Sequence, residues 1–154
     1  MKTLKTIGYW FVHCTWGILP TILGFFCFLF TRPFVKKTTT YKGMIVSYIG
    51  HNWGGFNLGP FAFIYVEAED RWTENRRITE HEWGHSIQGL VFGSFQLFVV
   101  DIPSAARYWY REYLRNHDYE KYKAQPDYDA IWFEGTATKI GAKYRESDEY
   151  WKNK

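Results

Sequence analysis

An uncharged apolar run near the N-terminus constrains this chain more than any other feature of its sequence. The run extends from Ile7 to Phe30, IGYWFVHCTWGILPTILGFFCFLF, and contains no Asp, Glu, Lys or Arg. A single helix of this length would extend about 36 Å at about 1.5 Å per residue, enough to cross a hydrocarbon core of about 30 Å. We therefore expect residues 1–33 to form an N-terminal membrane anchor with one transmembrane helix, kinked at Pro20.

A secretory signal peptide is the alternative interpretation of this run. Lys2 and Lys5 precede it, as the basic segment of a signal peptide would. However, the run is longer than the apolar segment of about 7–15 residues that signal peptides contain, and no cleavage site with small residues follows it. The sequence therefore favours a retained anchor, with the lipid bilayer as a partner. Within the run, His13 is expected at a helix interface and not as a metal ligand.

The composition supports contact with a membrane and gives no indication of a nucleic-acid partner. Aromatic residues make up 21% of the 154 residues, including 8 Trp and 12 Tyr, and such amphipathic rings are typical of membrane interfaces. The net charge is only +3, and the basic residues are interspersed with acidic ones, so we expect no nucleic-acid binding. Cys14 and Cys27 both lie in the apolar run, which excludes a disulfide framework and a paired-cysteine metal site.

Residues 34–154 are long enough for one compact domain, and the first part of it has the composition of a small sheet. β-branched and aromatic residues predict strands at 44–49 and 61–66, which we expect to form a small antiparallel sheet. His51 and Asn52 fall between the strands, where a hydrogen-bonded turn histidine is favoured over a ligand. The residues expected in the turns are Gly50, Gly54, Gly55 and Gly59-Pro60.

The sequence RRITEHEWGHSIQG, residues 76–89, is predicted to lie on a helix. The helix is expected to begin near Thr73 or Thr79 and to end near Phe92, just before a glycine. At 3.6 residues per turn it has one polar and one apolar side. The polar side carries His81, His85 and Gln88, and the largely apolar side carries Trp83, Ile87, Leu90 and Val91.

The pattern H-E-x-x-H on this helix points to a metal site. His81 and His85 are one turn apart, so both imidazoles can bind one Zn²⁺ at about 2.0–2.1 Å. Glu82 can approach a water molecule beside the metal as a general base. Gly84 removes a side chain at a point where another backbone is expected to pass close by.

A purely structural role for Glu82 is the alternative. Thr79-Glu80-His81-Glu82 fits a capping box, in which the Glu82 carboxylate would accept a hydrogen bond from the backbone amide of Thr79. In that case the helix would begin at Thr79, and the two histidines would be spaced by chance.

A metal site needs a third ligand, and Glu134 is the strongest candidate. It lies in DYDAIWFEGTATKIGAKY, a segment predicted to contain a helix. Its neighbours are apolar, and a buried carboxylate needs a cation or hydrogen-bond donors. A metal ion would meet that need, and the alternative is an ion pair with Lys139, Arg107 or Arg111. The other acidic and histidine candidates are Asp101, Glu112, His117, Asp118, Glu120, Asp127 and Asp129.

The pairing of HEWGH, residues 81–85, with EGTATKIG, residues 134–141, resembles the gluzincin metallopeptidases. Within them it is most similar to the membrane-embedded branch that includes the CAAX prenyl endopeptidases and the heat-shock membrane proteases. That branch has H-E-x-x-H on one helix and E-x-x-A-D-x-x-G on another, and the second pattern is matched here at Glu134, Ala137 and Gly141. The chain also resembles small bacterial membrane proteins with H-E-x-x-H-x-x-Q, which implies a bacterial inner membrane as its location.

The resemblance implies His81, His85 and Glu134 as zinc ligands, Glu82 as general base, and hydrolysis of a peptide bond as the reaction. It also implies a zincin-like α+β fold with the H-E-x-x-H helix and a C-terminal ligand helix. Thr138 stands where the family has Asp, a residue that supports a zinc-ligand histidine in that family. This departure bears on how the metal is held and on activity.

The segment FQLFVVDIPSAARYWYREYL, residues 95–114, begins apolar and becomes aromatic and basic. It is too short and interrupted for a second span. We expect a re-entrant or interfacial piece, and the alternative is a buried strand followed by an exposed amphipathic helix.

Three functions are consistent with these residues. The first is a membrane-bound zinc metallopeptidase that acts on a peptide or protein substrate, with Tyr144, Tyr108 or His117 as the donor to the oxyanion. The second is a non-catalytic membrane scaffold or partner-binding protein with a degenerate peptidase fold. An intramembrane site-two-type protease is disfavoured, because charged residues flank the histidines at Arg76, Arg77 and Glu80.

Overall fold

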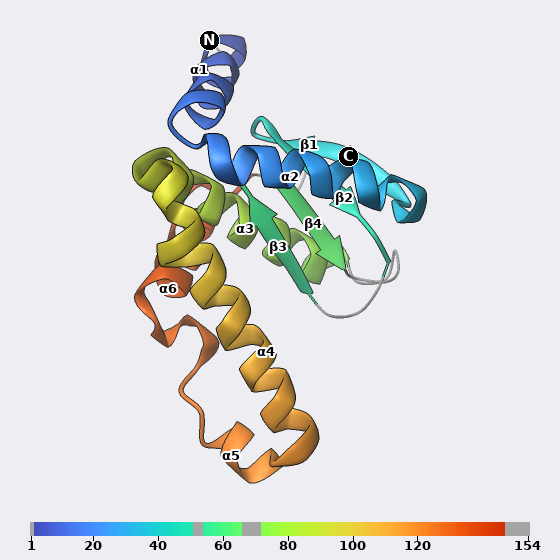
Figure 1. The fold of residues 1–154 in the computed structure, drawn as a ribbon, viewed down its shortest axis with the longest axis vertical. Helices are drawn as coiled ribbons and strands as arrows, with labels where there is room; N and C mark the ends of the chain where they lie inside the picture. Colours follow the sequence, from blue (N-terminus) through green and yellow to red (C-terminus); the bar gives the residue numbers. More distant parts are fainter. Residues whose placement is uncertain (1, 51–53, 66–71, 147–154) are drawn as a thin grey trace.

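The computed structural model of the protein describes residues 2–50, 54–65 and 72–146, and it has an α+β fold (Figure 1). The expected class is therefore confirmed. The elements in chain order are α1 (Lys2–Thr15), α2 (Ile18–Thr31), η1 (Arg32–Phe34), β1 (Lys37–Tyr41), β2 (Met44–Tyr48), β3 (Gly54–Leu58), β4 (Phe61–Tyr65), α3 (Trp72–Phe92), η3 (Gly93–Phe95), η4 (Leu97–Asp101), α4 (Ile102–His117), α5 (Tyr119–Lys123), η5 (Tyr128–Ala130) and α6 (Trp132–Lys143).

The N-terminal apolar run forms two helices in place of the single helix expected. The chain breaks at Trp16 and Gly17, where α1 and α2 are bent by 100°. Pro20 is not the cause, because it lies in the first turn of α2, where its missing N–H breaks no helical hydrogen bond. Among the described residues no single helix is long and apolar enough to cross a bilayer. Two bent pairs reach that length and composition together, 4–15 with 18–34 and 75–95 with 97–117.

The sheet has four strands in the order β1-β2-β4-β3 and is mixed. The strands expected at 44–49 and 61–66 are confirmed as β2 and β4. They pair in parallel, so the expectation of an antiparallel sheet is wrong. β1 pairs with β2 and β3 pairs with β4, both antiparallel. β4 is one of the two inner strands, and Phe61, Ala62, Phe63 and Ile64 are all buried there, as its continuous apolar sequence requires.

Two other expectations about this region have different outcomes. Gly54 and Gly55 were expected in a turn but begin β3, which is an edge strand. Gly59 and Pro60 do form the turn of the β3–β4 hairpin, and Gly59 has a φ of 59°, a conformation that favours glycine. His51 and Asn52 lie outside the described residues.

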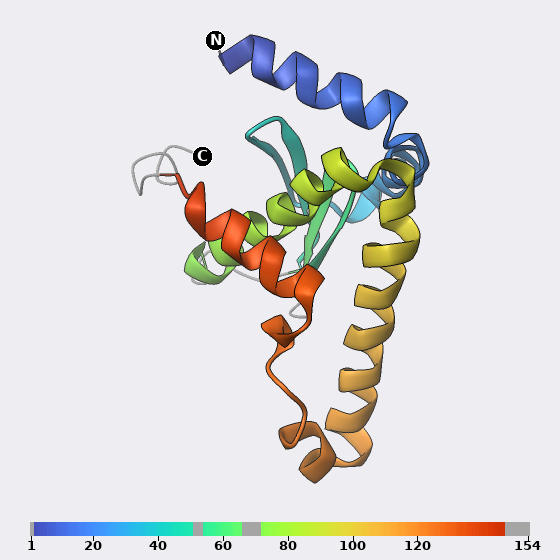
Figure 2. The same cartoon turned by 90° about the vertical axis from the view of Figure 1, so that its left-hand side faces the viewer.

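Helices cover both faces of the sheet (Figures 1 and 2). Alternate residues of β4 divide the core, as the two faces of a strand require. Phe61 and Phe63 contact the side covered by α2, where Cys27 and Phe28 pack. Ala62 and Ile64 belong to the cluster on the α3 side, with Met44, Val46 and Trp83. Whether residues 1–33 form a separate unit stays a prediction, and in the structure α2 contacts β3 and β4.

Residues 95–114 are helical throughout. They form the end of η3, the π-helical η4 and most of α4, so the alternative of a buried strand is wrong. α4 then extends away from the sheet, and α5 and the following segment return the chain to α6, which lies beside α3 (Figure 2). The long excursion therefore places the start of α6 against the helix with the H-E-x-x-H pattern.

Candidate metal centre

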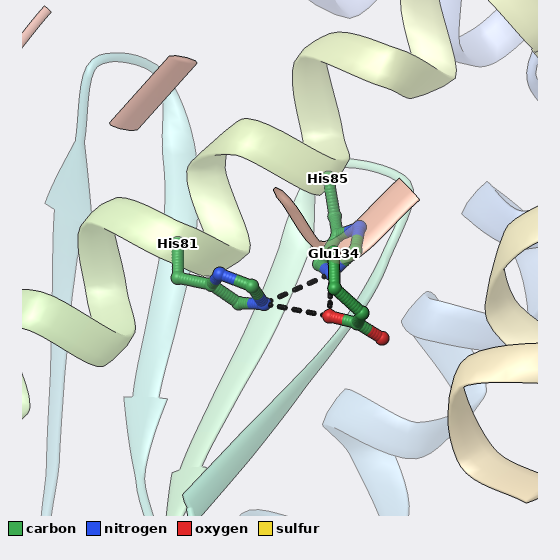
Figure 3. A group of neighbouring side chains, drawn as sticks. All are labelled: His81, His85 and Glu134. Carbon is green, nitrogen blue, oxygen red and sulfur yellow. Dashed lines mark hydrogen bonds and ion pairs between the residues drawn. The ribbon is translucent and has the colours of Figure 1, made fainter. Parts of the chain in front are cut away.

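Three side chains from two helices converge on one point (Figure 3). α3 supplies His81 and His85, and α6 supplies Glu134. The Nε2 atoms of the histidines are 3.1 Å apart, and Oε2 of Glu134 lies 3.1 Å from His81 Nε2 and 3.2 Å from His85 Nε2. Ligand atoms at about 2.05 Å from a tetrahedral ion are about 3.3 Å apart, so this triangle has nearly the dimensions of one face of such a site.

The three residues form a group that could hold a metal ion. Within the described part of the chain, no other cluster of three His, Cys, Asp or Glu side chains has this geometry. Of the eight downstream candidates for a third ligand, Glu134 alone joins the two histidines. His117, in contrast, stacks on Tyr113 near the end of α4.

The histidines are brought together by an uninterrupted helix. α3 begins at Trp72, and the Thr79 hydroxyl donates a hydrogen bond of 2.7 Å to the carbonyl of Asn75, one turn earlier in the same helix. Thr79 is therefore inside the helix and cannot be its N-cap. The capping-box alternative is wrong, which leaves Glu82 without that structural role.

The two ligand helices touch through glycines. A Cβ at Gly84 would lie 2.1 Å from the carbonyl oxygen of Ala137, and one at Gly141 would lie 2.5 Å from the carbonyl oxygen of Glu80. Any side chain at either position would push α3 and α6 apart. The expectation that another backbone passes close to Gly84 is confirmed, and this contact sets the distance between the histidines and Glu134.

Each histidine is held by a second contact on its other ring nitrogen. His81 Nδ1 lies 2.8 Å from the Thr138 hydroxyl, and His85 Nδ1 lies 2.8 Å from Gln88 Oε1. Gln88 Nε2 donates to the carbonyl of Phe133, which fixes the amide so that its oxygen faces the ring. His85 Nδ1 must then be the donor, which leaves the Nε2 lone pair free for a metal. The Thr138 hydroxyl can accept a hydrogen bond from His81 Nδ1 in the same way.

Glu134 is completely buried, and its partners account for both carboxylate oxygens. Oε2 faces the histidines, and Oε1 accepts a hydrogen bond from the Ser104 hydroxyl on α4. Arg107 and Arg111 donate to backbone carbonyls at 126–128. The alternative in which either arginine pairs with Glu134 therefore has no support in the structure.

Burial and charge act in opposite directions on the ionisable groups. Burial acts to raise the pKa of Glu134, but its hydrogen bonds to His81 and His85 hold that pKa well below its usual value. Burial would lower the pKa of His85, but the bond to Glu134 and the charges of Glu82 and Glu134 outweigh it and raise the pKa to about 9. Without a metal, the site thus favours a proton on His85 beside an ionised Glu134.

Glu82 lies beside this group and has a different environment. Its side chain is buried, and no hydrogen bond to its carboxylate is formed within the described residues. Burial is the main cause that raises the pKa of Glu82, opposed by the neighbouring histidines. A desolvated carboxylate with no structural partner is suited to accept a proton.

A cavity of about 970 Å³ opens over the site. One wall is the edge strand β3, and the opposite wall is η4 and α4. Both Glu82 and the histidines line it. Ser104 and Tyr128 are two further polar residues of this cavity that no sequence motif indicated, and their hydroxyls lie 3.5 Å apart. The helical spacing of 97, 100, 101, 104 and 108 is the signal that could have placed Ser104 on one face.

The expected oxyanion donors fall in different places. Tyr108 lines the cavity, whereas Tyr144 packs against Trp83. Comparisons with family models, with curated proteins and with solved structures find no match. The interpretation of the site therefore depends on its own geometry and chemistry.

Proposed function

We propose that this chain is a membrane-bound zinc metallopeptidase in which Glu82 is the general base. The observation that carries the proposal is the position of Glu82. Its carboxylate is buried and free of hydrogen bonds within the described residues, and it adjoins the only group of three ligands found there. A metal held only for stability would need no base next to it, and a capping role for Glu82 is excluded by the start of α3.

The donor set supports zinc as the metal. Two neutral imidazoles and one carboxylate are a common set for catalytic Zn²⁺, which keeps a fourth position for water or substrate. Bound there, zinc would polarise the scissile carbonyl and make a water molecule more acidic. His81, His85 and Glu134 would hold the ion, and Thr138, Gln88 and Ser104 would orient them.

Glu82 would move the protons of the reaction. It accepts a proton from the water that attacks the carbonyl carbon, and it then delivers that proton to the amine that leaves. Burial raises the pKa of Glu82, which makes its carboxylate a stronger base for this proton transfer.

The cavity also supports an extended peptide as substrate. β3 is the edge strand of the sheet beside the site, whereas β4 is an inner strand. A peptide could add to the free side of β3 by backbone hydrogen bonds, with its scissile bond near His81 and His85. Backbone hydrogen bonds need no particular side chain on the peptide, so this mode of binding does not define the amino-acid sequence of the substrate.

Tyr128 is the best placed donor to the oxyanion. Its hydroxyl lies 3.5 Å from that of Ser104, and the charge of Glu134 is among the causes that raise its pKa, after burial. The guanidinium groups of Arg107 and Arg111 lie 5.7 and 5.9 Å from its ring centre and hold the ring at the cavity wall. A neutral phenol at this position can donate to a developing negative charge.

The first experiment is metal analysis of purified wild type, His85→Ala and Glu134→Gln, followed by peptidase assays of Glu82→Gln. About one zinc per wild-type chain, lost in both ligand variants, is expected. Glu82→Gln should keep its zinc and lose activity at least about 100-fold. A folded wild type that binds no added zinc would overturn the proposal.

The second candidate is a non-catalytic scaffold with the same metal group. The family Asp is replaced by Thr138 here, and this replacement favours the scaffold. The two candidates differ in what Glu82→Gln removes: the peptidase loses its activity, whereas a scaffold has no peptidase activity to lose. Zinc-loaded wild type without activity on a broad peptide library would support this candidate.

A further inference from the structure

We infer that the protein inserts one apolar face, formed by α2 and residues 95–113, into the surface of an anionic bilayer, with α2 parallel to the membrane plane. We call this the lipid face. The inference goes beyond the proposed function, because it assigns an interaction surface and replaces a spanning anchor by insertion from one side.

The outer side of α2 is apolar and exposed. Its inner side rests on the sheet at Gly24, where a Cβ would lie 2.4 Å from the carbonyl oxygen of Leu58, so the orientation of the helix about its own axis is fixed. α2 contains no charged residue. The large apolar side chains left exposed on it are Ile18, Leu19, Ile22, Leu23, Phe25, Phe26, Leu29 and Phe30.

Residues 95–113 have two sides with different contacts. One side lines the metal cavity, through residues such as Val100, Ser104 and Tyr108. The other side points away from the cavity and repeats at helical spacing. Its exposed residues are Phe95, Phe98, Val99, Tyr110 and Tyr113, and the exposed side chains of Ile102 and Trp109 lie at the border between the two sides. Tyr113 stacks on His117 on this outer side, and the rings and aliphatic chains there remain exposed.

The two parts of the lipid face are joined at one corner. Ser94 N donates a hydrogen bond of 2.9 Å to the Trp16 carbonyl, and Trp16 Nε1 donates one of 3.2 Å to the Val91 carbonyl. Figure 1 shows α2 across the front of the sheet and α4 running beside and below it, and Figure 2 shows both helices on the same outer side of the molecule. The exposed rings and aliphatic chains therefore form one surface.

The lengths of the helices favour insertion over spanning. α2 has 14 residues, and at about 1.5 Å per residue it is about 21 Å long, shorter than a hydrocarbon core of about 30 Å. The bend of 100° prevents α1 from continuing it. α1 is also held at its inner side, since Tyr9 and His13 both contact the Ser86 hydroxyl of α3.

Charge identifies the bilayer as the partner in preference to a second copy of the chain. Before Glu67 there is no acidic residue, whereas Lys2, Lys5, Arg32, Lys36, Lys37 and Lys42 are basic. Arg32, Lys36 and Lys37 follow α2 directly, where they can reach anionic headgroups. A second copy of α2 and its flanking segments would offer these basic residues no acidic partner, because residues 1–66 contain no Asp or Glu. The exposed Trp109 and Tyr110 are suited to the headgroup region.

Vesicle flotation tests the partner. Full-length protein diluted from detergent should float with vesicles of phosphatidylcholine and phosphatidylglycerol at 3:1, and about tenfold less with phosphatidylcholine alone. Phe26→Asp and Phe98→Asp, at exposed positions of the two parts, should each weaken binding about tenfold. The matched control is Tyr119→Asp, an exposed ring on α5 outside the lipid face. Its binding should be unchanged.

Labelling from one side tests the orientation. Single cysteines replace Lys5 or Lys37 in a background without Cys14 and Cys27, and an impermeant maleimide is added outside the vesicles. Both sites should be labelled in intact vesicles, because neither helix crosses the bilayer. Protection of one site alone would show a spanning segment and overturn the inference. Dimerisation in solution without vesicle binding would also overturn it, and circular dichroism establishes that each variant is folded. Neither result depends on zinc or on peptidase activity.

Discussion

The Nδ1 atom of His81 lies 2.8 Å from the hydroxyl oxygen of Thr138, across the contact between α3 and α6. The sequence had suggested that Thr138 leaves this histidine without the carboxylate support seen in the gluzincins. The structure shows that the Thr138 hydroxyl contacts His81 Nδ1 and can support this ring. The difference is one of strength, because a hydroxyl is a weaker acceptor than a carboxylate and raises the basicity of the imidazole less.

Thr138→Val removes this acceptor and keeps the shape of the side chain. We expect zinc affinity to fall about 10- to 100-fold, because His81 loses the group that orients it. Thr138→Asp should restore or exceed the wild-type affinity. The control is Thr136→Val, an exposed residue of the same helix whose hydroxyl donates a hydrogen bond to the Trp132 carbonyl, away from the histidines. Competition with a chromophoric chelator measures all four proteins, and equal affinities would contradict this role of Thr138.

The proton on His85 predicts how zinc binding depends on pH. The metal needs a neutral imidazole, and the pKa of His85 is raised to about 9 by Glu134 and Glu82, which outweigh its burial. Affinity should therefore rise with pH by up to about tenfold per unit from pH 6 to 8. Calorimetry in buffers of different ionisation enthalpy should detect the released proton. An affinity independent of pH in this range would show that His85 is already neutral.

The same raised pKa of His85 makes the metal-free protein less stable as the pH rises, whereas zinc affinity increases. The pKa of His85 in the folded state, about 9, is above the usual 6.5, so the folded state binds this proton more tightly. The stabilisation is full below about pH 6.5 and is lost as the pH rises through about 9. Zinc-loaded protein should not lose stability over this pH range. Thermal unfolding of the metal-free and the zinc-loaded protein at pH 6 and pH 9 measures this difference.

The candidate site was more predictable than the fold around it, for physical reasons. The spacing of His81 and His85 is local, because a helix fixes which residues share a face. Glu134 could be found because a carboxylate among apolar neighbours needs a cation. Ser104 and Tyr128 depend on how α4 and the returning chain meet α6, which no local pattern encodes.

The N-terminal run and the sheet show where hydropathy and propensity fail. Hydropathy measures the length of an apolar segment and cannot detect the break at Trp16 and Gly17. That break lets Tyr9 and His13 reach Ser86 on α3. The parallel pairing of β2 with β4 could not be read from the strands either, because it depends on which strand is most deeply buried.

Gly84→Ala tests whether the contact between α3 and α6 builds the site. The new methyl group would meet the Ala137 carbonyl, so we expect a loss of about 1–3 kcal/mol in the free energy of unfolding. Zinc affinity should fall as well, because Glu134 moves away from the histidines. Gly8→Ala is the control, since no atom lies within 4 Å of its Cβ position inside α1. It should stabilise the protein by about 0.5–1 kcal/mol. Denaturant unfolding of Gly84→Ala and Gly8→Ala measures both changes in the free energy of unfolding.

Tyr128→Phe tests the proposed donor to the oxyanion. The phenol would act only when charge develops on the substrate, so the variant should lose kcat about 10- to 1000-fold with little change in KM. Its zinc content should stay at the wild-type level, because the hydroxyl is not one of the ligands. The same substitution at Tyr144, which packs against Trp83, should leave kcat unchanged.

Two other outcomes for Tyr128→Phe have distinct meanings. A rise in KM alone would place Tyr128 in substrate binding, because an interaction of equal strength in the ground state and the transition state changes KM and not kcat. Loss of zinc would show that the phenol supports Glu134 together with Ser104, whose hydroxyl is 3.5 Å away. Ser104→Ala separates these cases, since it removes the hydrogen bond to Glu134 and keeps the phenol. It should lower zinc affinity while kcat of the zinc-saturated enzyme changes far less than in Tyr128→Phe.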